Sequence, residues 1–418
     1  MNPHDTILLR CLRDPREMIA LDGHGIEALL ASARCAKVLA KLAQRALDAG
    51  IDEQLTPRFR DHLIASRVLA QHYRRGILWE AGCIQRALAT LNVPVVFLKG
   101  AAYMLADIPA GRGRFVSDID AMVPKSAIDA AEQLLLAGGW RSIKLDSYDQ
   151  RYYRQWMHEL PPMEHKQRKI VMDLHHTILP ESGRLKPDAG KLFAQSREIR
   201  EHQNGAEGKE DRRREVTNGS DQSAIRNSKS EINACSIRVL SPCDMILHSA
   251  AHLFQDGDLA GGLRDLLDLD DLLRDFGGDA NRPGREPDFW KLLVPRAVEM
   301  DLIRPLFYAL RFTSRLLDTP VPAAVLREAA DAGGPLWPTA PIMDFLTSRA
   351  MMPDFGESKK LGAASARWML YVRSHWLRMP PLLLAQHLGR KALRRWSKEE
   401  PEAPRTHEEM NVDAKRVA

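Results

Sequence analysis

The chain has 418 residues, of which 44% are hydrophobic and 28% charged, and its formal net charge is +5. This length allows two or three domains with a sizeable core, and the composition is that of a soluble globular protein. The five cysteines are scattered and include no C-x-x-C pair, which argues for a reducing compartment and against a zinc or disulfide framework.

The N-terminus does not have the pattern of a signal peptide. Met1 to Asp5 contain Pro and an acid where a signal peptide has basic and then apolar residues. No later run reaches 18 apolar residues, the length that a membrane-spanning helix needs. We therefore expect a cytoplasmic protein, or one that lies peripherally on the inner membrane.

The first 92 residues have a helical pattern. Apolar residues recur at three- and four-residue spacing in 25–48 and again in 57–91, which is typical of amphipathic helices. The second run leads directly into a β-rich stretch from Val95 to Leu98. We therefore expect residues 1–92 to form a helical cover for a sheet that contains this strand.

A candidate phosphate-binding segment follows the strand at Lys99 and Gly100. Glycine lets the backbone approach a ligand closely, and residues 101–106 have the pattern of a helix start, whose free N–H groups attract phosphate. Arg112 and Arg114 lie in the next loop, where a guanidinium fork can grip phosphate oxygens. The segment therefore predicts one side of a nucleotide site.

Three carboxylates are candidate metal ligands. Asp118 and Asp120 lie two apart in an apolar strand pattern, so both point to one face. Asp173 and His175 share a face of the next strand pattern in the same way. If the strands are neighbours, the carboxylates converge, and Mg²⁺ or Mn²⁺ with nucleotide phosphates suits such oxygen ligands. The candidate nucleotide-binding residues are Lys99, Gly100, Ala101, Arg112, Arg114 and His175.

These segments resemble the polymerase-β-type nucleotidyltransferase superfamily, and most closely its poorly characterised bacterial nucleotidyltransferase-like proteins. The resemblance is carried by Leu98-Lys99-Gly100, Asp118-Ile119-Asp120, Gly138-Gly139-Trp140 and Val171-Met172-Asp173-Leu174-His175. It implies that Asp118 and Asp120 bind two metal ions and that Asp173 binds the catalytic ion beside the acceptor hydroxyl. We expect an α+β fold, with a small mixed sheet in residues 93–196 wrapped by N- and C-terminal helices. Within that range, residues 127–137 have the pattern of a helix that ends at Gly138-Gly139.

The implied activity is transfer of a nucleoside monophosphate from an NTP to a hydroxyl or phosphate acceptor, with release of pyrophosphate. The superfamily usually has Gly-Ser or Gly-Gly where this chain has Gly100-Ala101, so a hydroxyl contact to the triphosphate is missing. That departure favours an alternative, a non-catalytic nucleotide-binding or scaffolding relative in a biosynthetic system such as exopolysaccharide synthesis. The three carboxylates oppose the alternative, because a scaffold has no need of converging charges.

The composition changes abruptly at residues 197–233, where polar residues dominate and little apolar surface is available for burial. We expect a disordered insertion there. Helical patterns return in residues 234–396, beginning at Ser241-Pro242. Four side chains of this part form either a metal site or, as we favour, a hydrogen-bonded network between two helices: His248, His252, Asp265 and Asp268.

The stretch 359–398 contains ten Lys or Arg and no acid, with interleaved Trp residues. This pattern suits either an anionic partner, such as lipid headgroups or nucleic acid, or packing on the acidic helix predicted at 265–275. Pro380 and Pro381 break the stretch into short helices, which favours packing. The remaining tail, 397–418, is polar, and we expect it to be flexible.

Overall fold

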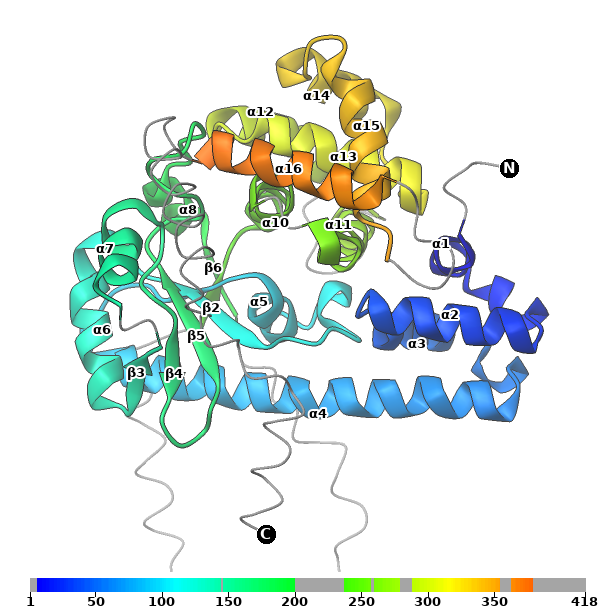
Figure 1. The fold of residues 1–418 in the computed structure, drawn as a ribbon. Coiled ribbons are helices and arrows are strands. Elements are labelled where there is room, and N and C mark those ends of the chain that lie inside the picture. Colours follow the sequence, from blue (N-terminus) through cyan, green and yellow to red (C-terminus); the bar gives the residue numbers. More distant parts are fainter. Residues whose placement is uncertain are drawn as a thin grey trace, which may run out of the picture.

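The computed structural model describes residues 6–143, 146–199, 237–256, 259–278, 288–353 and 362–378. Within them the chain forms one mixed sheet and a large number of helices, so the predicted α+β class is confirmed. Figure 1 shows the sheet at one end of the molecule, with the long helix α4 (Pro57–Leu88) below it and the C-terminal helices above.

The sheet has seven strands in the order β3-β4-β5-β2-β1-β7-β6. The pairs β2–β5 and β1–β7 are parallel, and the other neighbours are antiparallel. The strands are β1 (Val96–Phe97), β2 (Asp118–Met122), β3 (Trp140–Ser142), β4 (Met163–His165), β5 (Val171–His175), β6 (Arg197–Glu198) and β7 (Arg238–Val239).

The central strands follow the alternation that the sequence predicts. Ile119 and Ala121 of β2 are fully buried, and so is Met172 of β5, while the intervening carboxylates point to the other face. Because the two strands are parallel neighbours, their acidic positions lie side by side. The register pairs Asp120 with Asp173.

The helices predicted in 25–48, 57–91, 127–137 and after Ser241 are present within a few residues of the expected bounds. The helices other than α4 are α1 (Ile7–Arg13), α2 (Gly23–Cys35), α3 (Leu39–Asp48), α5 (Lys99–Leu105), α6 (Ile128–Ala137), α7 (Ser147–Trp156), α8 (Ala189–Gln195), α10 (Pro242–Asp256), α11 (Gly262–Phe276), α12 (Phe289–Glu299), α13 (Ile303–Leu317), α14 (Ala323–Gly333), α15 (Thr339–Ala350) and α16 (Ala363–Arg378).

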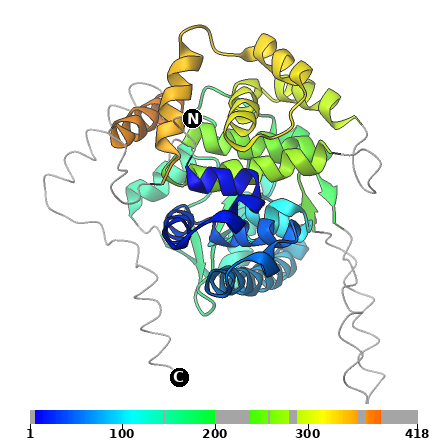
Figure 2. The same ribbon diagram turned by 90° about the vertical axis from the view of Figure 1, so that its right-hand side faces the viewer.

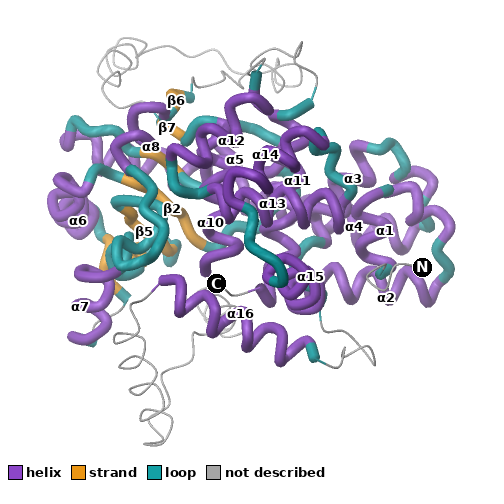
Figure 3. Tube along the Cα trace, turned by 90° about the horizontal axis from the view of Figure 1, so that it is seen from above, coloured by secondary structure: helices purple, strands orange, loops and turns teal. Residues whose placement is uncertain are grey.

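The N-terminal helices sit between α4 and the C-terminal helices (Figure 2). Seen from above, they lie at the opposite end of the molecule from α6 and α7, with α5 and α11 between the two ends (Figure 3). Helix α4 spans this distance and contacts both α5 and α6. It is therefore the element of the N-terminal segment that reaches the layer of the sheet.

Buried ion pairs join the N-terminal helices to α11. From α3, Lys41 Nζ lies 2.7 Å from Asp271 Oδ2, and Arg45 Nη2 lies 2.5 Å from Asp270 Oδ2. Asp270 is completely buried, and its other oxygen accepts hydrogen bonds from Arg274 and Thr319. Each of these buried charges has a partner, as a buried charge requires.

The structure changes the predicted start of the polar insertion. Arg197 and Glu198 form β6, which pairs with β7, and the N–H of Ile199 donates to the carbonyl of Ile237. The chain therefore remains in the sheet to residue 199. The rest of the predicted insertion, and the predicted tail at 397–418, lie outside the described residues.

Part of the basic stretch is described, as α16. Its Arg367 donates to the carbonyls of Ala350 and Met352, and Arg373 donates to the carbonyl of Phe254. These arginines are held by backbone oxygens, whereas the α11 carboxylates Asp265, Asp268, Asp270 and Asp271 pair with basic residues of α3, of the loop before β2 and of α11 itself. Residues 379–398 lie outside the described residues. None of the described helices is long and apolar enough to span a membrane.

Candidate active site

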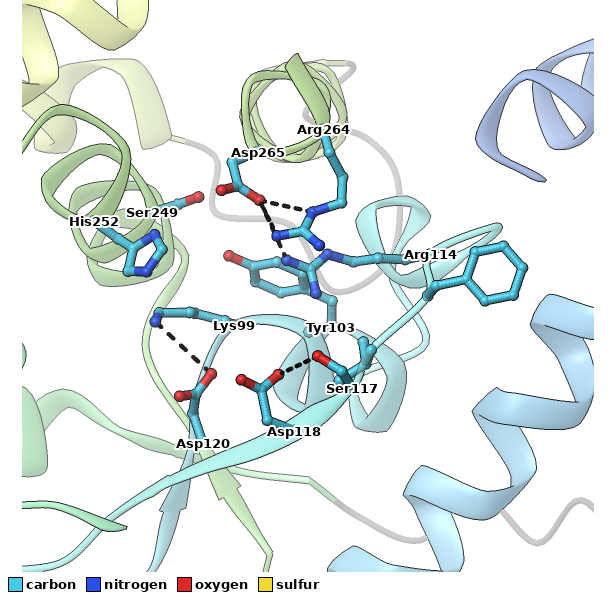
Figure 4. Close-up of a pocket in the computed structure, with 13 residues that line it drawn as sticks. Lys99, Tyr103, Arg114, Ser117, Asp118, Asp120, Ser249, His252, Arg264 and Asp265 are labelled. Carbon is cyan, nitrogen blue, oxygen red and sulfur yellow. Dashed lines mark hydrogen bonds and ion pairs between the residues drawn. The ribbon is translucent and has the colours of Figure 1, made fainter. Parts of the chain in front are cut away.

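The three predicted carboxylates come from the two central parallel strands. Asp118 and Asp120 lie on β2, and Asp173 lies directly opposite Asp120 on β5. In Figure 4 both β2 carboxylates point into the pocket, where Asp118 Oδ1 accepts a hydrogen bond of 3.2 Å from Ser117. The strand register thus brings together residues that are more than 50 positions apart in the sequence.

Lys99 is the cation of this cluster. Its Nζ lies 3.8 Å from Asp120 Oδ2 (Figure 4). The Lys99 backbone has φ +43°, a left-handed conformation that non-glycine residues rarely adopt and that often marks functional sites. Burial would raise the pKa of Asp120, but the charge of Lys99 and the hydrogen bond from His175 lower it far below its usual value. Asp120 is therefore ionised.

Asp173 has the opposite electrostatic environment. Burial and the negative charges of Glu159, Asp120 and Asp118 raise its pKa to about 7. Its Oδ1 atom is buried without a hydrogen-bond partner. An unsatisfied buried carboxylate oxygen beside other carboxylates is an unfavourable arrangement that a bound cation relieves. These oxygen donors are of the kind that a hard divalent cation such as Mg²⁺ or Mn²⁺ prefers. Among the described residues, however, Asp118, Asp120 and Asp173 do not all lie within the 4.8 Å spacing of a single-ion ligand group, and Asp173 does not line the pocket that contains Asp118 and Asp120.

His175 lies behind the carboxylates and is only 1% exposed. Its Nε2 is 3.1 Å from Asp120 Oδ1 and its Nδ1 is 3.4 Å from Glu159 Oε2. Burial alone would lower the pKa of His175, but the hydrogen bond with Asp120 and the charge of Glu159 raise it. His175 thus orients Asp120, whereas we expected it to contact the nucleotide.

Sequence reasoning missed Glu159 and its neighbour His158. Neither belongs to a regular strand, but a β-bridge joins Glu159 to His175 at the end of β5. The available signal was a pair of polar residues next to the apolar Leu160, which by itself indicates nothing about a site. The bridge to β5 supplies the connection that the sequence does not show.

Arg114 and Gly100 form the wall that faces the carboxylates. Arg114 Nε lies 2.5 Å from Asp268 Oδ2 and Nη2 lies 3.7 Å from Asp265 Oδ1, so α11 holds this guanidinium. A Cβ atom at Gly100 would lie only 2.2 Å from Arg114 Nη1 and 2.5 Å from a Val116 methyl group. Gly100 is therefore needed for Arg114 to reach the pocket wall.

The alternative metal site at His248, His252, Asp265 and Asp268 is arranged differently from a ligand cluster. The two carboxylates pair with Arg114 and Arg264. Burial and the nearby charge of Lys99 lower the pKa of His248 well below its usual value. These contacts pair both carboxylates with arginines, and the predicted hydrogen-bonded network between the two helices stays a prediction.

Two other predicted nucleotide-binding residues lie away from the carboxylates. Ala101 is buried inside α5, at 1% exposure. Arg112 lines a separate hollow with Arg67, Arg74 and Arg75 of α4, and its Nη2 is 3.9 Å from Asp107. The structure therefore does not bring Arg112 to the metal-binding cluster, because the chain reverses direction between Arg112 and Arg114 at Gly113, which has φ +68°.

The pocket encloses about 120 Å³ between β2, α5, α10 and α11. Its polar lining includes residues that the sequence did not single out, among them Tyr103, Ser249 and Arg264 (Figure 4). Pockets that enclose whole small molecules usually measure roughly 300–1,000 Å³. This pocket therefore has room for a metal and a phosphate group, but not for a whole nucleotide.

A comparison with protein families gives a match over most of the chain. The family model described as "Uncharacterised nucleotidyltransferase" matches residues 22–318, which include the whole carboxylate cluster and α11. The chain belongs to this nucleotidyltransferase family. No curated protein and no solved structure gives a match.

Proposed function

We propose that the protein is a metal-dependent nucleotidyltransferase that moves a nucleoside monophosphate from an NTP to a hydroxyl or phosphate acceptor in the cytoplasm. The observation that carries the proposal is the pairing of Asp120 with Asp173 on neighbouring parallel strands, with a buried, unsatisfied oxygen on Asp173. Membership of the nucleotidyltransferase family supports the general class of reaction.

Asp118, Asp120 and Asp173 would hold Mg²⁺ or Mn²⁺. Such an ion neutralises charge on the triphosphate and lowers the pKa of a bound hydroxyl. Lys99 adds a positive charge beside Asp120, where the β- and γ-phosphates would lie. Gly100 leaves room for the Arg114 guanidinium, which lies against the Gly100 backbone and adds a second positive charge to the pocket wall.

The transfer step needs a group that accepts a proton. The acceptor oxygen attacks the α-phosphorus, the bond from that phosphorus to the bridging oxygen breaks, and pyrophosphate leaves with the electron pair. Asp173 would take the hydroxyl proton. A carboxylate placed beside the acceptor oxygen can act as a general base in this way.

One observation favours the alternative, a non-catalytic relative that binds nucleotide or serves as a scaffold in a biosynthetic system. Ala101 offers no hydroxyl to a triphosphate and is buried, and the neighbouring pocket is small. A complete NTP would extend beyond this pocket. The alternative protein would bind Mg²⁺ and nucleotide but release no pyrophosphate.

A labelling experiment separates the two functions. The protein is incubated with Mg²⁺, a cell extract and each α-phosphate-labelled NTP in turn, and the extract is searched for a labelled product. We expect label in one acceptor, with an equal amount of pyrophosphate. Nucleotide binding without label transfer and without pyrophosphate from any of the four NTPs would contradict the enzymatic proposal.

A further inference from the structure

His158, Glu159 and His175 form a second cluster of ligand atoms. His175 is the last residue of β5, the strand labelled in Figure 1. Glu159 Oε2 is 3.4 Å from His175 Nδ1 and 3.9 Å from His158 Nε2. One ligand atom from each of the three residues lies within 4.8 Å of the others. In the part of the chain that the structure describes, His158, Glu159 and His175 are the one group of His, Cys, Asp or Glu side chains whose ligand atoms are this close together.

The backbone fixes this arrangement. The segment that carries His158 and Glu159 pairs with the end of β5, since the N–H of Leu160 donates to Leu174 and the N–H of His176 donates to His158. The bridge between Glu159 and His175 lies between these two bonds. The three ligand residues are therefore held by main-chain hydrogen bonds, and not only by their side chains.

The two histidines are buried and incompletely satisfied. His158 is 9% exposed and His175 is 1% exposed, and the Nδ1 atom of each has no hydrogen-bond partner. Buried polar nitrogens usually have a partner, so these two are unusual. The His175 Nδ1 atom lies 3.4 Å from Glu159 Oε2, whereas the His158 atom nearest that oxygen is Nε2, at 3.9 Å.

His175 touches both clusters through the two nitrogens of its ring. Its Nε2 lies 3.1 Å from Asp120 Oδ1, and its Nδ1 lies 3.4 Å from Glu159 Oε2. A cation bound to both Nδ1 and Oε2 fits this second separation.

We propose that His158, Glu159 and His175 bind a transition-metal ion, Zn²⁺ in the first instance, at a site separate from the Mg²⁺ carboxylates. Two imidazole nitrogens and one carboxylate suit Zn²⁺, whereas Mg²⁺ prefers oxygen ligands alone. Ligands at the usual zinc distances in a tetrahedron lie about 3.3–3.4 Å apart, close to the separation of Glu159 and His175. Three protein ligands leave the fourth position to water.

This ion would link the two sites through one imidazole. A metal on Nδ1 of His175 keeps the proton on Nε2, and that proton holds Asp120 in place. His175 is then a positioning residue for the Mg²⁺ site. The inference does not depend on transferase activity, because it concerns metal bound in the absence of nucleotide.

Metal binding to the full-length protein tests the proposal directly. The protein is stripped with a chelator, dialysed into excess Mg²⁺ at neutral pH, and titrated with Zn²⁺, or with Co²⁺ so that the visible spectrum reports the ligands. We expect one Zn²⁺ per chain that excess Mg²⁺ does not displace, and a Co²⁺ spectrum with intense bands from low coordination. Failure of the stripped wild-type protein to retain Zn²⁺ would overturn the proposal.

Three variants locate the ion. His158→Gln and Glu159→Gln each remove a ligand. Each should weaken Zn²⁺ binding by more than roughly 100-fold, which is the upper limit for loss of a residue that only hydrogen-bonds to a metal ligand. The control is His176→Gln, next to His175 in sequence but 3.9 Å from Glu181. Circular dichroism establishes whether each variant is folded. If His158→Gln does not fold, Glu159→Gln still tests the site, because Gln has nearly the same shape as Glu. Retention of Zn²⁺ by both ligand variants, or equal loss from His176→Gln, would overturn the assignment.

Discussion

Asp173 is the residue whose environment depends most on a bound cation. Its neighbours Glu159, Asp120 and Asp118 all carry negative charge, and burial adds to their effect on its pKa. The Asp173 side chain therefore lowers the stability of the metal-free protein. When a metal ion is present, the same side chain would add to the affinity for the ion. This behaviour is typical of functional residues that are retained at a cost in stability.

The pH dependence of stability follows from Asp173. Its pKa is about 7 in the folded protein and near 3.9 in an unfolded chain, so the folded state binds more protons between these values and stability falls as pH rises from about 4 to 7. Asp173→Asn should remove this loss and stabilise the metal-free protein at pH 8 by roughly 4 kcal/mol, at 1.36 kcal/mol for each unit of pKa difference. Thermal unfolding with chelator at pH 4.5 and pH 8 measures it. Identical pH dependence in variant and wild type would contradict the assignment.

Asp120 should be indispensable for transfer. Asp120→Asn keeps the shape of the side chain but removes the charge that faces Lys99 and the metal, so transfer should fall by roughly 10²–10³-fold or more. The far-ultraviolet circular dichroism spectrum should stay unchanged. Asp129→Asn, an exposed position in the first turn of α6, is the matched control and should keep full activity.

Gly100 tests the wall of the pocket. In Gly100→Ala the new methyl group would collide with Arg114 and Val116, which should cost roughly 1–3 kcal/mol of stability. Gly76→Ala on α4 is the control, since nothing lies within 4 Å of its Cβ position and alanine favours a helix. Urea unfolding of both variants measures the difference. Equal stability of the two would show that Arg114 can move away freely.

At the scale of the elements, α11 holds the fold around the site. One of its carboxylates, Asp268, fixes Arg114 in the pocket wall, while Asp270 and Asp271 fix α3. The N-terminal helices and the pocket wall therefore depend on the same helix. The sequence shows α11 as an acidic amphipathic helix, but its partners lie more than 150 positions earlier in the chain.

Loss of one buried charge on α11 should be far more damaging than loss of an exposed one. Asp270→Ala removes one of the two carboxylates that pair with Arg45, together with the acceptor of Arg274 and Thr319, and should cost roughly 3–5 kcal/mol. Asp288→Ala removes an exposed pair with Lys291 and should change stability by less than about 1 kcal/mol. Chemical unfolding of both variants gives the comparison. A small effect of Asp270→Ala would mean that α3 is held mainly by apolar packing.

At the scale of the whole molecule, the sequence predicted the strands and helices that have a clear periodic pattern. Alternation identified β2 and β5, and the helical period identified α4, α6, α10 and α11. The predicted convergence of the three Asp residues rested on an assumption that the two strands are neighbours, and the parallel β2–β5 ladder supports it.

The remainder depends on long-range contacts. Strands β3, β4, β6 and β7 have two or three residues each, too few to give a periodic signal. Glu159 joins the site only because its segment pairs with the end of β5. Arg112 was assigned to the site by proximity in sequence to Arg114, but a left-handed glycine between them sends it to another surface.

The central claim is that the three carboxylates form one site for a metal–nucleotide complex, and thermal unfolding tests it most directly. The melting temperature is measured for wild type and Asp120→Asn with Mg²⁺ alone, each NTP alone, and both together. We predict that the melting temperature of wild type rises only when Mg²⁺ and one NTP are present together. At a ligand concentration near 100 times the Kd, the stabilisation should be about 2–3 kcal/mol. The melting temperature of Asp120→Asn should not rise. An unchanged melting temperature in wild type with every NTP, or an equal rise in the variant, would contradict the claim.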